Sequence, residues 1–133
     1  MSNVSAYAEK AMLDWVLLGA TPTRPGTVAV GLSLGAPTSV SGSEMGTASG
    51  YTRKTATFGA AASPAGSATL AAAVTFGPFQ TAYSITGLQV WDTNGVAVDA
   101  GNMLWYGNLA TARTVASGDS LVIASGALTI TLA

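Results

Sequence analysis

The placement of turn-forming residues constrains the fold of this chain more than any other feature of its sequence. After residue 26 the chain is divided into short apolar runs, each bounded by Gly, Pro, Asn, Asp or Ser. In the first run Val28, Val30, Leu32 and Leu34 alternate with small residues, which is the pattern of a half-buried strand. Six further strand-like runs follow at residues 52–58, 69–76, 85–91, 103–109, 121–124 and 128–132.

The N-terminal segment has a different period and predicts a helix. Asn3 or Ser2 can cap its start, and Gly19 followed by Thr21-Pro22 can end it. One apolar face of this helix comprises Val4, Ala8, Ala11, Met12 and Trp15. Leu13 and Leu17 lie off that face and form a second apolar edge, which could pack on the chain's own sheet or on a neighbouring subunit.

One helix followed by seven or eight short strands, with no alternation of strands and helices, indicates a mainly β protein. We therefore predict an antiparallel β-sandwich or jelly-roll-like barrel preceded by one N-terminal α-helix. The 133 residues fit one domain, so we expect a single domain over residues 1–133. The helix is expected within residues 1–19 and the β-sandwich within residues 27–133.

The side chains that most often perform chemistry are scarce. The chain has no histidine, no cysteine and only five cationic and six acidic residues. Histidine is the usual general base near neutral pH, and histidine and cysteine are the usual ligands of transition metals. We therefore expect no enzymatic activity, no catalytic residue, no metal and no cofactor.

One short segment resembles a calcium loop. In Asp92-Thr93-Asn94-Gly95, followed by Asp99, oxygen-bearing side chains alternate before a glycine. The distal glutamate of such loops is missing, and Asp-x-Asn-Gly is also the sequence of an ordinary hairpin turn. The turn is the preferred interpretation.

Charge and hydropathy argue against two classes of partner. The formal net charge is −1, and Arg53 and Lys54 are the only adjacent cations, so a phosphate-binding patch is not expected. The apolar run from Ala11 to Ala20 is too short to span a bilayer and contains Asp14. We expect no nucleic-acid partner and no membrane segment, and the absence of a basic N-terminal cluster predicts synthesis in the cytoplasm.

A surface with so few charges also predicts a homo-oligomer, since little charge is available to keep a monomer soluble.

Several separate sequence blocks, in a fixed order, are similar to one known family. The blocks are Gly50-Tyr51-Thr52-Arg53-Lys54 with residues 57–61, Val74-Thr75-Phe76, residues 85–88 before Trp91-Asp92, Leu104-Trp105-Tyr106-Gly107-Asn108-Leu109, Thr114-Val115, residues 118–121, and residues 126–132. The chain resembles a family of small structural proteins of tailed bacteriophages that are often labelled tail-fibre-like. It departs from the family at Gly77, where proline is common, and at residues 89–91, where Gly-Ile-Phe is common.

The resemblance implies a virion component made in the host cytoplasm, and it brings no catalytic residues. We expect a capsid decoration or cement protein that stabilises the head lattice by contacts with the major capsid protein or another virion protein. The expected contact residues are Tyr7, Leu13 and Leu17 on the helix and Val40, Met45 and Tyr51 in or next to the loop after the first strand. The alternative is a tail-associated or fibre-tip module that recognises a host-surface glycan, for which Trp91 is the expected exposed aromatic residue.

Overall fold

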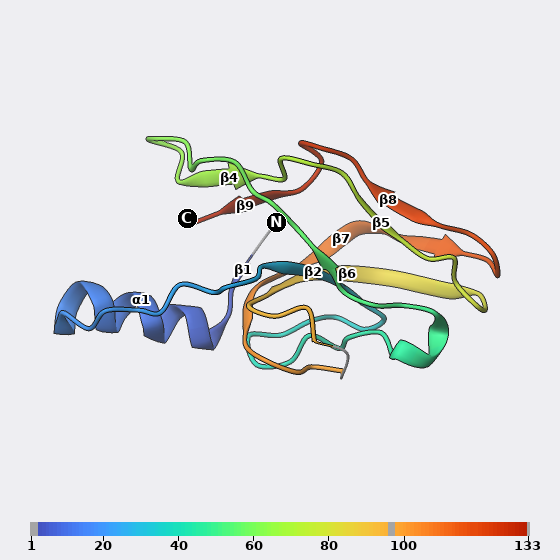
Figure 1. The fold of residues 1–133 in the computed structure, drawn as a ribbon, viewed down its shortest axis with the longest axis horizontal. Helices are drawn as coiled ribbons and strands as arrows, with labels where there is room; N and C mark the ends of the chain where they lie inside the picture. The colour runs from blue at the N-terminus through green and yellow to red at the C-terminus, as the bar shows by residue number, and fades with distance from the viewer. Residues whose placement is uncertain (1–2, 96–97, 133) are drawn as a thin grey trace.

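The fold is mainly β, with one N-terminal helix and antiparallel sheets packed on one another, so the predicted fold class is confirmed. The structure is a computed structural model and describes residues 3–95 and 98–132 (Figure 1). Its elements in chain order are β1 (Asn3–Val4), α1 (Ala6–Leu18), β2 (Ala29–Ser33), the 3-10 helix η1 (Thr47–Ser49), β3 (Lys54–Thr55), β4 (Ser67–Thr69), β5 (Val74–Phe76), β6 (Tyr83–Trp91), β7 (Met103–Val115), β8 (Leu121–Ile123) and β9 (Thr129–Thr131).

The residue that caps the start of the helix is Ser5, whereas the sequence predicted Asn3 or Ser2. The Ser5 hydroxyl accepts a hydrogen bond from the backbone N–H of Ala8 and donates one to the carbonyl of Met103. Asn3 instead belongs to β1, and Ser2 lies outside the described residues. Gly19 ends the helix at φ 73°, in the left-handed region that glycine adopts without a Cβ clash, so the predicted C-terminus is confirmed.

A five-stranded antiparallel sheet in the order β1-β7-β6-β2-β3 forms the middle of the molecule. Because side chains alternate along each strand, Val30 and Leu32 of β2 share one face with Leu88 and Val90 of β6, their cross-strand partners. The opposite face carries Gln89, together with the other alternate residues of these strands. β7 extends six residues beyond its predicted end, since a bulge between the partners of Ile85 and Gly87 lets it continue along β6.

A second layer covers the first face of this sheet, as Figure 1 shows. It is a two-stranded ribbon made of β4–β9 and β5–β8, joined where Leu70 donates to the carbonyl of Leu128 and accepts from the N–H of Gly126. The predicted strand at residues 69–76 is therefore divided in two, because the chain turns at the small residues 71–73. The core lies between the β5–β8 end of the ribbon and the sheet, and its largest fully buried members include Phe76, Phe79 and Ile85.

The other face of the sheet is covered by connections without regular strands. They are residues 34–53, which include η1, and residues 92–102 between β6 and β7, of which Val96 and Ala97 lie outside the described residues. The strand predicted at residues 52–58 shrinks to Lys54–Thr55, with isolated pairing at Phe58. The Asn94-Gly95 turn predicted from sequence is part of the longer connection, so β6 and β7 are not joined by a two-residue turn.

Candidate interaction site

The second half of α1 projects from the body and is apolar on almost every side. Figure 1 shows α1 extending past the end of the five-stranded sheet. Leu13 and Trp15 are each 58% exposed, and Leu17 and Leu18 are each 78% exposed. The single charged residue here, Asp14, forms an ion pair with Lys10 one turn earlier. A helix that is apolar all round is normally buried, so the exposure of this segment, residues 13–18, hereafter the α1 tip, makes it a candidate contact surface.

The start of α1 is held firmly to the body. β1 pairs with β7 at Tyr106 and Trp105, and the N–H of Ser5 donates to the carbonyl of Leu104 at 3.0 Å. Ala6 donates to the carbonyl of Ser39 at 3.0 Å. Within the helix only Ala8 is buried among the described side chains. The body therefore fixes the direction of α1 while leaving the α1 tip free of intramolecular contacts that would bury it.

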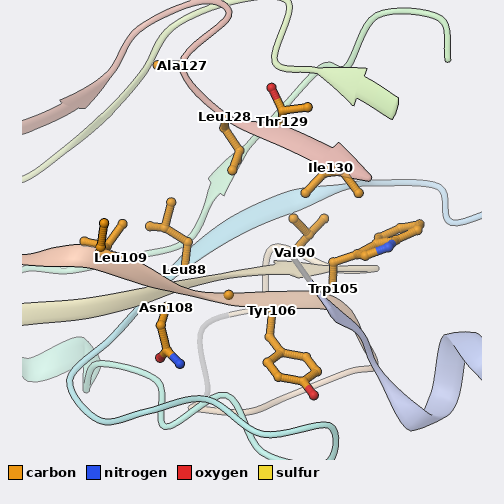
Figure 2. A pocket seen from close by; sticks show the side chains of 12 residues that line it. Leu88, Val90, Trp105, Tyr106, Asn108, Leu109, Ala127, Leu128, Thr129 and Ile130 are labelled. Carbon is orange, nitrogen blue, oxygen red and sulfur yellow. The ribbon is translucent and has the colours of Figure 1, made fainter. Parts of the chain in front are cut away.

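An apolar groove separates the β4–β9 end of the ribbon from the five-stranded sheet. It consists of two adjoining hollows of about 340 and 260 Å³ that share Val90, Trp105 and Ile130 as lining residues. The smaller hollow is lined almost wholly by apolar atoms, whereas polar and apolar atoms border the larger one in similar measure. Figure 2 shows Leu88 and Val90 of the sheet pointing toward Leu128 and Ile130, whereas Tyr106 and Asn108 project from the opposite face of the sheet, away from the groove. None of the described residues that line either hollow is charged. The two layers are thus packed at the β5–β8 end and open at the β4–β9 end.

Trp105 gives this groove its one unsatisfied polar group. In the described part of the chain, its indole Nε1 is the single buried side-chain nitrogen or oxygen without a hydrogen-bond partner. Burying an unpaired N–H costs about 1–3 kcal/mol, and indole N–H groups usually find an acceptor when they are buried. Because this atom is buried, an acceptor from outside could remove that cost only with a rotation of the Trp105 side chain.

A buried ion pair organises the opposite face of the sheet. Arg53 forms a bidentate pair with Glu44, with Nε–Oε1 and Nη2–Oε2 distances of 2.7 Å, and both side chains are almost fully buried. Arg53 also donates to the carbonyls of Thr93 and Ala100, and Glu44 accepts from the N–H of Asp99. The pair therefore fixes the connection at residues 92–102 to the loop that contains Glu44.

Three further side chains extend this network. The guanidinium of Arg53 lies 3.9 Å from the ring centre of Trp91, and the Trp91 indole donates to Gln89 Oε1 at 3.2 Å. The Tyr51 hydroxyl donates to Glu44 Oε1 at 2.8 Å and accepts from the N–H of Leu32. Burial, and secondarily the negative charge of Glu44, raises the pKa of Tyr51 far above its ordinary value, so the phenol stays neutral.

A Cβ at Gly31 would lie 2.5 Å from Gln89 Oε1, which is why glycine stands in the middle of β2.

The seven predicted contact residues fall into four groups. Leu13 and Leu17 belong to the α1 tip, and Tyr7 (48% exposed) and Val40 (82% exposed) flank a smaller pocket of about 240 Å³ beside the start of α1. Met45 and Tyr51 are buried in the core, so their side chains contact their own protomer. The expectation that Trp91 is exposed is wrong, since the residue is only 3% exposed with Arg53 over its ring.

The most prominent contact residues were partly missed from the sequence. The sequence places Trp15 on the first apolar face, with Val4, Ala8, Ala11 and Met12, and gives no role to Val16 and Leu18, although residues 15–18 form an unbroken apolar run that the body leaves exposed. The groove around Trp105 could not be predicted from any local sequence pattern, because its walls come from strands that are distant in the sequence.

The acidic groups that resemble a calcium loop have other roles in the structure. The Asp92 carboxylate accepts hydrogen bonds from the backbone N–H and the Nδ2 of Asn102 at 2.8 Å. Among the described residues, no group of three potential metal-ligating side chains comes together. The one described helix falls short of the length and apolarity that crossing a bilayer requires.

The fold and these surfaces define a class: a small, sparsely charged β-sandwich whose prominent external features are apolar contact surfaces. The family described as "Podophage GP4 fiber I protein gp80" matches residues 3–131, which is nearly the whole chain, and the protein belongs to this family. It is therefore a bacteriophage structural protein and a component of the virion. No curated protein matches the sequence.

Proposed function

We propose that this protein is a non-enzymatic building block of the podophage fibre, attached to its neighbours through the α1 tip. The observation that carries the proposal is the exposure of Leu13, Leu17 and Leu18 on a helix that is rigidly mounted on the body. Burying such side chains stabilises an interface by roughly 25 cal/mol per Å² of apolar area, before the costs of association. The family description supports a place on the fibre.

Contact through α1 also explains how an almost uncharged protein can function in a particle. The binding free energy comes from apolar area and needs no charged group, and repetition of the same contact along a fibre strengthens the assembly through multivalency. No covalent step is required, consistent with the absence of histidine and cysteine.

Location and incorporation in the virion test this proposal. Phage carrying Leu17→Glu should lack the protein in quantitative mass spectrometry of purified particles, whereas phage carrying Val122→Glu should retain it. Val122 is the matched control, since it is 58% exposed but lies on β8, on the ribbon. The wild-type protein should appear in fibre density by electron cryomicroscopy. Density on the head lattice would overturn the fibre assignment in favour of capsid decoration, and normal incorporation of Leu17→Glu would overturn the role of α1.

Host-glycan recognition is a second candidate, because one pocket has suitable chemistry. Tyr7, half exposed, lines the 240 Å³ pocket together with Asp99 and Asn102, and an aromatic ring beside polar groups is suited to a sugar. Trp91, which this hypothesis first relied on, forms only a buried wall there. Binding of the purified protein to host envelope polysaccharide, abolished by Tyr7→Ser, would support this candidate, and equal binding by both proteins would contradict it.

A further inference from the structure

We propose that the α1 tip of one copy occupies the apolar groove of a second copy, so that fibre subunits associate by exchanging their helices. This inference rests on the proposed function and specifies its partner surface. It commits to a second copy of this chain as the occupant.

The two surfaces match in charge and polarity. The groove is lined by apolar and uncharged side chains only, among the described residues, and its shared lining residues are Val90, Trp105 and Ile130. The α1 tip presents five large apolar side chains, and its one carboxylate is already paired with Lys10. Neither surface would bury an unpaired charge in the complex, which is the usual obstacle to association of this kind.

The groove also has a buried polar group, Trp105 Nε1, that lacks an acceptor within the described chain. Trp105 Nε1 is buried without an acceptor, and the last four carbonyls of any α-helix have no partner within the helix. At the C-terminus of α1 the backbone N–H groups of Gly19 and Ala20 both donate to the carbonyl of Asp14. The later carbonyls of the α1 tip are therefore left as acceptors. An inserted helix end would therefore supply apolar side chains to the groove, and its free carbonyls would reach Trp105 Nε1 once the Trp105 side chain turns toward the incoming helix.

The mounting of α1 favours exchange between copies. Val4 pairs with Trp105, so the helix begins beside the residue at the centre of the groove, and Figure 1 shows it extending beyond the sheet, on the side of the molecule where β4 and β9 lie. The anchors at Ser5 and Ala6 hold this direction, which keeps the α1 tip out of its own groove. Each copy therefore offers a neighbouring copy both a free helix and an open groove. If two copies exchange helices reciprocally, the assembly closes as a symmetric dimer.

Cysteine cross-linking between different chains tests the contact, because the natural chain has no cysteine. Full-length Leu17→Cys and Ile130→Cys proteins are purified separately, mixed and oxidised. We expect a disulfide-linked heterodimer, at least ~10-fold more abundant than in a mixture of Leu17→Cys with the control Val122→Cys, because apposition raises the effective thiol concentration to the millimolar range. The wild type should have at least twice the protomer mass by light scattering, and Leu17→Glu should have the mass of one protomer.

Each other outcome overturns the inference in a recognisable way. Cross-linking of Leu17→Cys with itself in place of Ile130→Cys would indicate a bundle of α1 helices. An intrachain disulfide in a protein carrying both cysteines, with monomer mass, would indicate that the tip folds into its own groove. A wild type that is monomeric and does not cross-link, while Leu17→Glu is still lost from virions, would refute helix exchange and leave the proposed function standing.

Discussion

At the residue scale, the connections on one face of the sheet are held by electrostatics in a protein that otherwise has almost none. Glu44 and Arg53 use two of the eleven charged side chains of the chain, and both are buried. All the polar atoms of the pair are occupied by one another, by Tyr51, or by backbone groups of the connection at residues 92–102. A buried pair with complete hydrogen bonding fixes a conformation, whereas a half-removed pair leaves an uncompensated charge.

Removing both members of the pair should therefore cost less than the sum of the costs of removing each one alone. We expect Glu44→Gln to lower the free energy of unfolding by about 3–5 kcal/mol, because Arg53 stays buried without its counter-charge. The double variant Glu44→Gln/Arg53→Met should lose less than the sum of the two single variants, as measured by urea denaturation in a double-mutant cycle. Additive single effects would show that the two side chains are not coupled.

Tyr51 makes the free energy of unfolding depend on pH in the alkaline range. Its pKa is raised in the folded protein, chiefly by burial, so the folded state keeps the phenolic proton where the unfolded chain, with an ordinary pKa near 10, loses it. The stabilisation is complete below about pH 10 and declines as the pH rises above it. The unfolding free energy of the wild type should thus fall more steeply between pH 9 and 11 than that of Tyr51→Phe. Parallel pH profiles for the two proteins would contradict this.

At the element scale, α1 is secured at one end only. Ser5 is fully buried and combines two roles, since its hydroxyl caps the helix and also bonds the backbone of β7. The remainder of the helix has little contact with the body, and an isolated helix of 13 residues is marginal in water. The stability of α1 in the free protomer therefore depends on its cap.

Ser5→Ala should loosen α1 while leaving the sandwich folded. Loss of an N-cap side chain costs about 1 kcal/mol, and the amides of α1 should exchange with deuterium several-fold faster. The control is Asn3→Ala, which removes the side chain that the sequence suggested as the cap and that the structure places in β1. Equal acceleration of exchange by the two variants would argue against Ser5 as the cap.

The elements that could be predicted from sequence are those specified by local patterns. The alternation in residues 28–34 and 85–91 and the glycine after Leu18 determine β2, β6 and the end of α1 directly. What could not be predicted depends on residues that are distant in the chain. Trp91 is buried with Arg53 over its ring, and Met45 and Tyr51 are buried in the core, where Tyr51 stacks on Phe76. The corner at residues 71–73 was missed because three alanines carry no period.

At the scale of the whole molecule, the sandwich is asymmetric. Its buried core is concentrated between the sheet and β5–β8, where Phe76 is fully buried and Val74 nearly so. At the other end β4 and β9 contain no fully buried residue among those described, and the groove separates them from the sheet. The β5–β8 half of the ribbon is therefore packed against the sheet, whereas the β4–β9 half lacks such packing in the free protein.

Hydrogen exchange should reveal these two halves. Amides of β9 should exchange at least ~10-fold faster than those of β8 in dilute protein, because opening a poorly packed segment costs less free energy than opening the core. As the concentration rises and α1 of a second copy fills the groove, protection should increase in β9 while β8 stays unchanged, since ligation stabilises only the segment it contacts. Leu17→Glu provides the control, and its β9 amides should stay unprotected at every concentration. Uniform protection of the two strands in dilute protein would show that the β4–β9 end is packed as tightly as the core and that the sandwich is not asymmetric.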